Sequence, residues 1–318
     1  MAQLLIQNGN TTYAPTILDD VQWTTKRQGE AGSLHFTVLD DGKIKFEEGN
    51  AVRFQFKDKK VFYGFIFSKE SDKENLIDVV AYDQLRYLKN KDTYVFSNKR
   101  ADQILKMIAN DFGMNTGTLQ NTKYSIPSIV EDNKTLFDMI NNALGITLQN
   151  TGEQYIFYDD FGNLTLKRMQ DLSLPTLVDK DTAENFKYTS SIDEETYNRV
   201  KLIRENEEKR TREILISQDS KNINNWGVLQ HFDTIEENEN GKSKADALLR
   251  LYNTKTKTLE ITNQFGDTRV RGGTMLPVAL QLNDTRISNM MLVEKVTHRF
   301  KRDEHFMDLT LWGGEFSA

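Results

Sequence analysis

The hydrophobic pattern of residues 49–112 predicts three strands followed by a helix. Residues 50–57 place an apolar side chain at every second position, which is typical of a strand buried on one face. An aromatic and β-branched run follows at residues 61–67, and a third apolar run at residues 76–82. Polar turns separate the runs, so the pattern predicts an antiparallel meander. Gly64, inside the second run, indicates a bulge or bend.

The helix is predicted by apolar residues that recur every three or four positions. They are Ala101, Ile104, Leu105, Ile108, Ala109 and Phe112. Ser97 or Asn98 is available as the N-cap, and Gly113 follows the last apolar residue, where it permits the left-handed conformation that ends many helices. The meander therefore leads into an amphipathic helix.

A mixed segment follows this helix. Residues 135–144 predict a second helix that ends at Gly145. Residues 155–158 and 164–167 are strand-like and flank a turn that contains glycine, which indicates a hairpin. This part of the chain is expected to form a compact α+β module.

Strand patterns dominate on both sides of that module. Residues 16–39 contain short strand-like runs, which together with the meander indicate a small barrel or sandwich. Strands return at residues 197–203 and 212–216, and the chain ends in a long hairpin. This hairpin resembles residues 62–82 in pattern, which indicates two similar β-domains in one chain. Between them, Ala245, Leu248, Leu249 and Tyr252 predict a third short amphipathic helix, and residues 259–262 predict a strand.

Composition narrows the class of protein. At 318 residues the chain is long enough for about two domains. It contains no cysteine, which excludes disulfides, thiolate metal sites and thiol nucleophiles. The first ten residues lack a basic region and a long apolar run, so we expect no signal peptide, and no later run is long enough to span a bilayer. The net charge of −6 argues against a surface that wraps nucleic acid and favours proteins as partners.

The histidines and tryptophans do not form a recognisable site. His298 and His305 can meet across the terminal hairpin, but without nearby carboxylate ligands such a pair more often packs than binds a metal. Sugar-binding sites use exposed aromatic rings, whereas scattered tryptophans more often lie in cores or interfaces. The tryptophans are Trp23, Trp226 and Trp312.

The carboxylates and glycine-rich segments also have simpler explanations. Adjacent acids occur at Asp159 and Asp160 and at Glu194 and Glu195. A glycosidase needs two carboxylates held across a sugar, whereas acids in turns usually cap backbone amides. Residues 236–241 resemble the start of a calcium loop, but Ala247 occupies the position of the closing carboxylate. Residues 271–273 lack the lysine and spacing of a phosphate-binding loop. We therefore predict no catalytic, cofactor-binding or metal-binding residues, and no enzymatic activity.

The order of these segments resembles the tail hub proteins of contractile-tailed phages. The likeness is greatest to hubs of defective prophages and phage-tail-like bacteriocins of Gram-positive bacteria, and it includes the hub part of type VI secretion spike proteins. The segments that carry it span nearly the whole chain. They are 49–52 (GNAV), 61–66 (VFYGFI), 81–88 (AYDQLRYL), 94–99 (YVFSNK) with the helix after it, 197–200 (YNRV), 226–230 (WGVLQ), 245–249 (ADALL), 296–300 (VTHRF) and 307–309 (MDL).

The resemblance implies a β-rich α+β fold with two small barrel-like antiparallel β-domains, a mixed α+β module and a short helix-strand insertion. The predicted domains are residues 1–92 for the first barrel-like domain, 93–185 for the module, 186–235 with 272–318 for the second barrel-like domain, and 236–271 for the insertion.

The resemblance also implies a structural function. Three chains would form a pseudo-six-fold ring that joins the hexameric tail tube to the trimeric central spike. The expected partners are copies of the chain itself, the tube protein, the spike protein and other baseplate proteins, with no cofactor, no stable nucleic-acid binding and no membrane insertion. The protein would be made in the cytoplasm of a bacterial host and built into a virion or tail-like particle.

Two other functions stay open at this point. A tail-associated peptidoglycan hydrolase would show a cleft with two converging carboxylates, at least one of them with a raised pKa. A carbohydrate-binding tail-tip adhesin would show exposed aromatic rings on a shallow face. The sequence does not assign the residues of any partner interface.

Overall fold

The computed structural model describes residues 2–193, 195–206, 211–235, 240–281 and 286–313. Strands make up 54% of the structure and helices 19%, which confirms the predicted β-rich α+β class. The chain divides into two compact units. Unit 1 consists of Met1–Phe186 with Glu260–Leu311, and unit 2 of Lys187–Leu259 with Trp312–Ala318.

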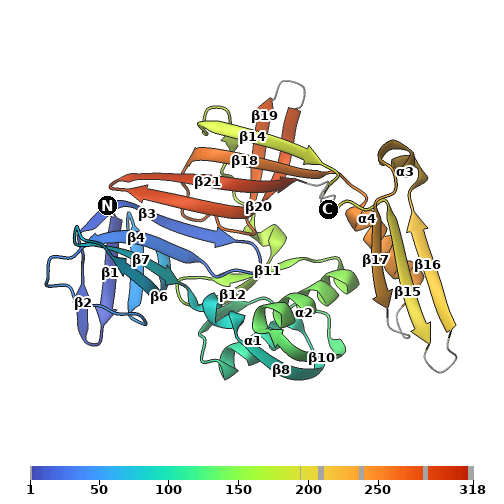
Figure 1. The fold of residues 1–318 in the computed structure, drawn as a ribbon, viewed down its shortest axis with the longest axis horizontal. Helices are drawn as coiled ribbons and strands as arrows, with labels where there is room; N and C mark the ends of the chain where they lie inside the picture. The colour runs from blue at the N-terminus through green and yellow to red at the C-terminus, as the bar shows by residue number, and fades with distance from the viewer. Residues whose placement is uncertain (1, 194, 207–210, 236–239, 282–285, 314–318) are drawn as a thin grey trace. The chain divides into compact units, whose positions relative to one another are not determined.

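Among the described residues, thirteen strands form one large sheet (Figure 1). Its order is β14-β18-β21-β20-β3-β4-β7-β6-β5-β1-β2, with β19 attached to β20 and β13 to β19. The strands are β1 (Ala2–Asn8), β2 (Thr11–Tyr13), β3 (Ile17–Lys26), β4 (Ser33–Leu39), β5 (Ala51–Phe56), β6 (Lys59–Ser71), β7 (Leu76–Tyr82), β13 (Val178–Asp179), β14 (Asn185–Ser191), β18 (Thr256–Phe265), β19 (Met275–Gln281), β20 (Arg286–Lys301) and β21 (Glu304–Gly313).

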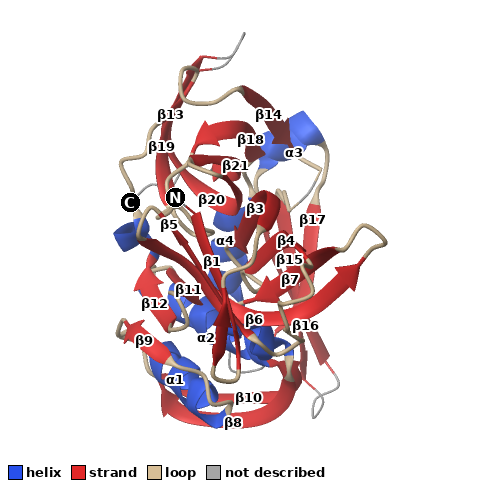
Figure 2. Cartoon of the chain, turned by 90° about the vertical axis from the view of Figure 1, so that its left-hand side faces the viewer, coloured by secondary structure: helices blue, strands red, loops and turns tan. Residues whose placement is uncertain are grey.

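The predicted meander is confirmed as the antiparallel strands β5, β6 and β7. Together with β1, β3 and β4 they surround one apolar core, and Figure 2 shows these six strands as neighbours. Of the bulge or bend predicted at Gly64, the bulge does not occur there, because Gly64 is in regular register with Val52. The register shifts lie on either side of it, at Val61 and Phe67. Gly64 instead lets two strands approach, since a Cβ atom there would lie 2.2 Å from the carbonyl oxygen of Tyr82.

The α+β module forms two small sheets and two helices. Its elements are η1 (Gln84–Lys89), β8 (Lys91–Lys99), α1 (Ala101–Asp111), β9 (Thr116–Leu119), β10 (Ile126–Thr135), α2 (Leu136–Thr151), β11 (Tyr155–Asp159), β12 (Leu164–Arg168) and η2 (Met169–Leu172). Strand β8 pairs with β10, and β12 lies between β11 and β9, so the predicted hairpin is confirmed.

Both helices of the module differ from prediction at one end. The apolar stripe of α1 is buried as predicted, and Gly113 has a positive φ of 64°. The N-cap, however, is Arg100, because Ser97 and Asn98 belong to β8. Helix α2 passes through Gly145 and ends at Gly152 (φ 71°), which adopts the left-handed conformation that Gly145 does not.

Unit 2 contains a three-stranded sheet with a helix on one face. Its elements are β15 (Arg199–Asn206), β16 (Thr211–Gln218), α3 (Ser220–Trp226), β17 (Gln230–Ile235) and α4 (Gly241–Tyr252), in the order β16-β15-β17. Helix α4, predicted from its apolar spacing, buries Ala245 against Val200 and Leu202 of β15. The helix thus covers one face of the sheet.

The terminal hairpin is confirmed as β20 and β21, and β20 also connects distant parts of unit 1. Its first half pairs with β19 and its second half pairs with β3, from Lys295 opposite Lys26 to Phe300 opposite Val21. The side chain of Phe300 lies in the apolar core that β1 and β3 to β7 surround. Strand pairing by itself does not define domains, so the four predicted segments stay a proposal.

Gly64 provides a test of this packing. Replacing it with alanine places a Cβ atom against the Tyr82 carbonyl, and we expect the free energy of unfolding to fall by about 1–3 kcal/mol. The control is Gly145→Ala, because this glycine is inside α2 and a Cβ atom there meets no heavy atom within 4 Å. We expect the control to raise stability by up to about 1 kcal/mol. Urea unfolding measures both, and similar effects of the two changes would contradict the described close contact.

Candidate functional site

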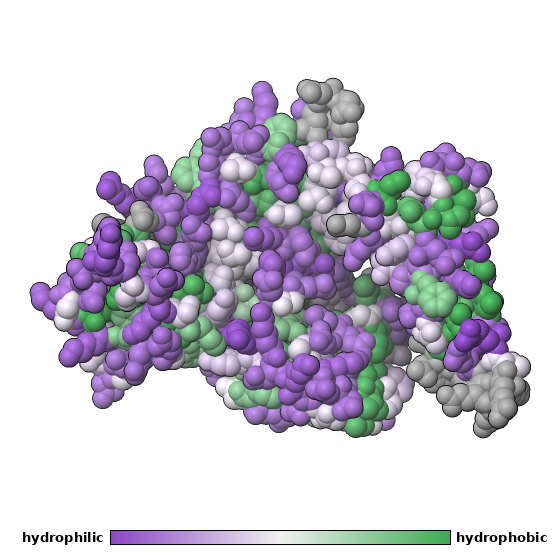
Figure 3. Space-filling view, viewed as in Figure 1, coloured by the Kyte–Doolittle hydropathy of each residue, from purple (hydrophilic) through white to green (hydrophobic). Residues whose placement is uncertain are grey.

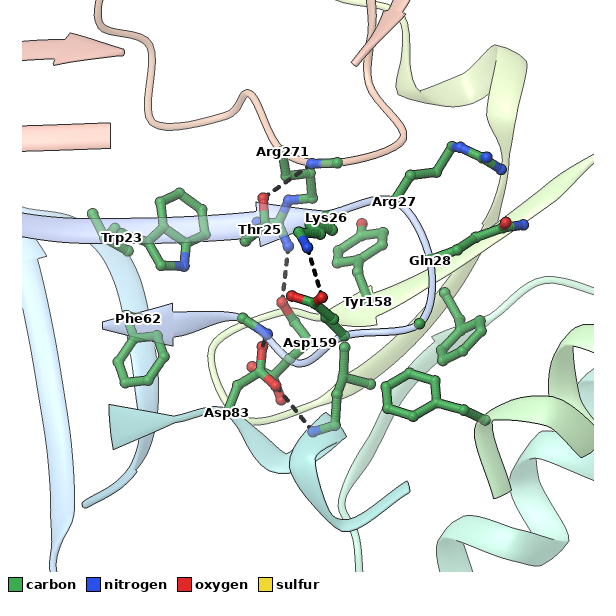
Figure 4. A pocket seen from close by; sticks show the side chains of 18 residues that line it. Trp23, Thr25, Lys26, Arg27, Gln28, Phe62, Asp83, Tyr158, Asp159 and Arg271 are labelled. Carbon is green, nitrogen blue, oxygen red and sulfur yellow. Dashed lines mark hydrogen bonds and ion pairs between the residues drawn. The ribbon is translucent and has the colours of Figure 1, made fainter. Parts of the chain in front are cut away.

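Buried and half-buried polar side chains gather where several segments of unit 1 meet (Figure 4). Asp83 directly follows β7, Asp159 is the last residue of β11, and Arg271 lies between β18 and β19. The end of β3 contributes Trp23 and Thr25 to the same cavity. These segments are far apart in the sequence, so their meeting point is a property of the fold.

Asp83 is held by backbone N–H groups. One carboxylate oxygen accepts a hydrogen bond from Gly32 at 2.9 Å, and the other accepts from Leu85 at 3.0 Å, which makes Asp83 the N-cap of η1. A Cβ atom on Gly32 would lie 2.4 Å from the Asp83 carboxylate, so this approach requires glycine. Burial, and then the charge of Asp159, raise the pKa of Asp83 well above its usual value.

Asp159 caps the turn between β11 and β12, where its Oδ1 accepts from the Gly162 N–H at 2.7 Å. Burial raises the pKa of Asp159 to about 6, although this hydrogen bond and the charge of Arg271 act in the opposite direction. Its Oδ2 is buried and has no hydrogen-bond partner among the described residues. The neighbouring Asp160 side chain is 60% exposed, so the two adjacent carboxylates do not share an environment.

Arg271 is the third polar residue of this site. We call Asp83, Asp159 and Arg271 together the polar junction. Its guanidinium lies 4.3 Å from the ring centre of Tyr158 and 5.8 Å from that of Trp23. Nη1 donates to the carbonyl oxygen of Asp159 at 2.8 Å, and Nη2 lies 3.7 Å from the Asp160 carboxylate. Its positive charge lowers the pKa of both buried carboxyl groups, which offsets part of the effect of burial.

The junction has two features expected of a hydrolase and lacks a third. Asp83 and Asp159 line one cavity and both have raised pKa values. The cavity volume, however, is about 20 Å³, which is room for about one water molecule. A sugar ring does not fit between these carboxylates. The arrangement holds β3, the α+β module and the loop after β18 together.

His298 and His305 do meet, and they form a packed pair. Nδ1 of His298 lies 2.9 Å from Nε2 of His305, and Nε2 of His298 lies 2.9 Å from the carbonyl oxygen of Val270. Burial lowers the pKa of His298 to about 3 and that of His305 to about 4, so both rings are neutral at pH 7. The Trp23 ring stacks on His298 at 4.8 Å, and the Phe300 ring on His305 at 4.2 Å.

The remaining sequence candidates lie apart. Trp23 is buried, and Trp226 and Trp312 are half-buried. Glu194 and residues 236–239 of the calcium-like segment lie outside the described residues, while Ala247 is inside α4. Within the described ranges, no group of three or more His, Asp or Glu side chains is placed to hold a metal ion.

The glycines after Arg271 serve close packing. A Cβ atom on Gly272 would lie 2.2 Å from the backbone of Lys26, and its N–H donates to Oγ1 of Thr25 at 3.0 Å. A Cβ atom on Gly273 would lie 2.6 Å from the Ile156 side chain. This segment therefore packs on β3 and the module.

Sequence reasoning missed the junction. Asp83 had a local signal, because an acidic residue between a strand and a helical turn is a common N-cap. Arg271 had none, since its ring and carbonyl partners lie at Tyr158 and Asp159, over 100 positions earlier. The pairing can be found only from the fold.

The face of the unit 2 sheet opposite α4 carries exposed apolar side chains. Ile214, Ile216 and Phe232 are exposed on the face opposite α4, and hydrophobic atoms show over these strands in Figure 3. Lys201 pairs in register with Ile216 and Phe232, and its ammonium group lies 5.9 Å from the Phe232 ring centre. Contiguous exposed apolar side chains of this kind are typical of interaction surfaces.

No helix within the described residues combines the length and apolar character needed to cross a bilayer.

Comparison with known proteins identifies relatives over nearly the whole chain. A family model described as YQBQ-like matches residues 21–312. The phage-like element PBSX protein XkdQ of Bacillus subtilis (strain 168) is 32% identical over 310 residues, which cover 94% of this chain and 94% of that protein. The similarity therefore extends over nearly all of both sequences.

Two solved structures show the same fold. The 43 kDa tail protein of prophage MuSo2 from Shewanella oneidensis matches with a TM-score of 0.71 at 12% identity, covering 97% of this chain and 98% of that one. The E. coli c3393 protein matches with a TM-score of 0.56 at 12% identity, covering 98% of this chain and 77% of that one. It is described as a type VI secretion component with structural similarity to T4 tail proteins gp27 and gp5. The resemblance to tail hub proteins is confirmed in the fold.

The buried carboxyl of Asp159 makes stability depend on pH. Because its pKa is higher in the folded protein than in the unfolded chain, the protonated form favours folding, and this contribution is lost as the pH rises through about 6. Asp159→Asn cannot ionise. We expect its stability relative to wild type to rise between pH 4 and pH 7 by on the order of 1–3 kcal/mol, measured by urea unfolding.

Asp160→Asn is the matched control for this change. This side chain is exposed, so we expect an effect below about 0.5 kcal/mol. Equal pH dependence of wild type and Asp159→Asn would show that the buried carboxyl does not titrate as described.

Proposed function

The chain belongs to the YQBQ-like family, and on this basis we propose that it is the structural hub of a contractile-tail baseplate. Three copies form a pseudo-six-fold ring that joins the hexameric tail tube to the trimeric central spike. Its partners are the tube protein, the spike protein and other baseplate proteins of a phage or tail-like particle.

The observation that carries this proposal is the extent of the match. A relative from a phage-like element and a prophage tail protein each align with more than nine-tenths of the chain. Here the tail-type fold accounts for both the β-regions and the α+β module.

The strand arrangement supports a symmetry-matching function. Each chain contributes two antiparallel β-regions, one formed around β4 to β7 and the other around β18 to β21, and β3 and β20 join them in one sheet. Three chains then contribute six such regions, which is what a ring needs to face six-fold symmetry on one side and three-fold symmetry on the other. The exposed apolar side chains of Ile214, Ile216 and Phe232 on β16 and β17 support contact with further proteins.

We further propose that the hub is not an enzyme. The paired carboxylates of Asp83 and Asp159, which provide the best support for a hydrolase, enclose about 20 Å³. The alternative of a tail-associated peptidoglycan hydrolase is tested by adding the purified chain to cell walls. We expect no loss of turbidity, and clearing by the wild-type chain that Asp159→Asn abolishes would establish the hydrolase.

The ring is tested by solution mass. We expect a species of three times the 36.8 kDa chain mass, either alone or together with the spike protein, in light scattering after size exclusion. A trimer that forms only with the spike still agrees with the proposal. A strict monomer under both conditions contradicts it.

A further inference from the structure

A hollow of about 650 Å³ lies in unit 1 between the β5–β6 turn and the loop after β18. Lys57 and Lys59 of the turn form one side of it, and Gln264, Asp267 and His305 lie on the other. The turn is tightly constrained, because Lys57 and the residue after it have positive φ angles of 47° and 63°, as in the turns that favour short hairpins. The backbone of the turn therefore places both lysines at the rim of the hollow.

Gln264 presents a hydrogen-bond acceptor without a donor. Its Nε2 donates to the carbonyl oxygen of Leu177 at 3.2 Å, which fixes the orientation of the amide. Its Oε1 is buried and has no partner in the described part of the chain, and the residue is 1% exposed. A buried acceptor without a donor costs free energy until a donor arrives.

His305 presents a second acceptor in the same hollow. The Val270 carbonyl can only accept, so Nε2 of His298 donates to it, and Nδ1 of His298 then accepts from Nε2 of His305. With both rings neutral, Nδ1 of His305 is an acceptor, and no described residue donates to it. The hollow thus offers two acceptors.

The charges at the hollow are positive and unmatched. Neither Lys57 nor Lys59 has a carboxylate partner among the described residues, and Lys57 instead lies 5.2 Å from the Phe56 ring centre. Asp267 is already satisfied, because Arg269 donates to it at 2.7 Å and Oγ1 of Thr176 at 2.6 Å. A ligand for this hollow must therefore bring negative charge and hydrogen-bond donors together.

We propose that the hollow binds an acidic peptide segment of a neighbouring copy of this chain. Carboxylates of the segment pair with Lys57 and Lys59, and its backbone N–H groups donate to Gln264 and His305. This inference rests on the proposed ring. It adds one of the contacts that close the ring.

A second copy of this chain can supply the negative charge that the hollow requires. A ring is built from a contact between two different surfaces, so one chain must carry both halves. The chain has 47 acidic and 41 basic residues, so it has carboxylates in excess of its cations. Exposed acidic turns are present in unit 1, for example at Asp40 and Asp41, whose side chains have no cationic partner among the described residues.

Zero-length carbodiimide cross-linking of the full chain tests this contact. Unlabelled and ¹⁵N-labelled copies are mixed, assembled, cross-linked and digested. We expect cross-linked peptides at Lys57 or Lys59 that combine one labelled and one unlabelled half, because the reagent joins a lysine only to a carboxylate that touches it. Assembled rings without such mixed peptides at either lysine overturn the proposal.

Charge reversal provides the second measurement. We expect Lys57→Glu with Lys59→Glu to weaken self-association at least tenfold in analytical ultracentrifugation, with an unchanged urea midpoint because both side chains are exposed. The control is Lys60→Glu, which reverses one charge beside the same turn, half the charge change of the double variant. The Lys60 ammonium lies 5.2 Å from the Phe161 ring centre and does not line the hollow, so we expect less than a twofold effect.

The outcomes separate this inference from the ring itself. If the wild-type chain is a monomer with and without the spike, the ring fails and this contact fails with it. If the wild-type chain assembles and the Lys57 and Lys59 double variant assembles equally well, the ring stands and the acidic-peptide contact is overturned. Equal weakening by the double variant and by Lys60→Glu shows a general charge effect and also overturns it.

Discussion

The pairing of β20 with β3 is the contact on which the rest of unit 1 depends. Six residue pairs join them, and Oγ1 of Thr24 and Oγ1 of Thr297 are 3.0 Å apart across the ladder. Phe300 extends from β20 into the first core, with its ring centre 5.0 Å from that of Phe54 and 5.1 Å from that of Phe56. Pairing β3 with β20 closes a loop that contains most of the chain, which costs conformational entropy. Burial of aromatic side chains such as Phe300 must offset this cost.

This pairing also creates the polar junction. With β20 beside β3, the loop before β19 lies on the end of β3, where Gly272 donates to Thr25. Arg271 is then placed over Tyr158. Burying two carboxyl groups beside one guanidinium does not add much stability by itself, because desolvation opposes the attraction. The junction instead fixes the arrangement of β3, the α+β module and the loop before β19, because its polar groups find their partners only when these three segments lie as described.

The sequence predicted local structure well and long-range pairing poorly. The meander, the terminal hairpin and the helices α1 and α4 follow from period and turn residues, because those signals lie within a few positions of one another. Helix ends were harder, since Gly145 and Gly152 look alike until φ is known. The pairing of β3 with β20 has no local signal, because a period of two shows which face of a strand is buried but not which strand lies beside it.

Because long-range pairing has no local signal, the sequence also does not show which polar residues are buried together. A carboxylate such as Asp159 is indistinguishable in the sequence from a surface acid, and only the fold shows that it is enclosed. Lys57 and Gln264 lie over 200 positions apart in the sequence, yet both line one hollow. There the charge of Lys57 and the acceptor oxygen of Gln264 have no partner among the described residues. An enzyme concentrates unmatched groups in a cleft that fits a substrate, whereas an assembly protein distributes them over its surface. In unit 1 the Asp83 and Asp159 carboxyl groups line a small cavity and the free acceptor of Gln264 is buried, whereas Lys57 and Lys59 are exposed, where the proposed ring contact can reach them.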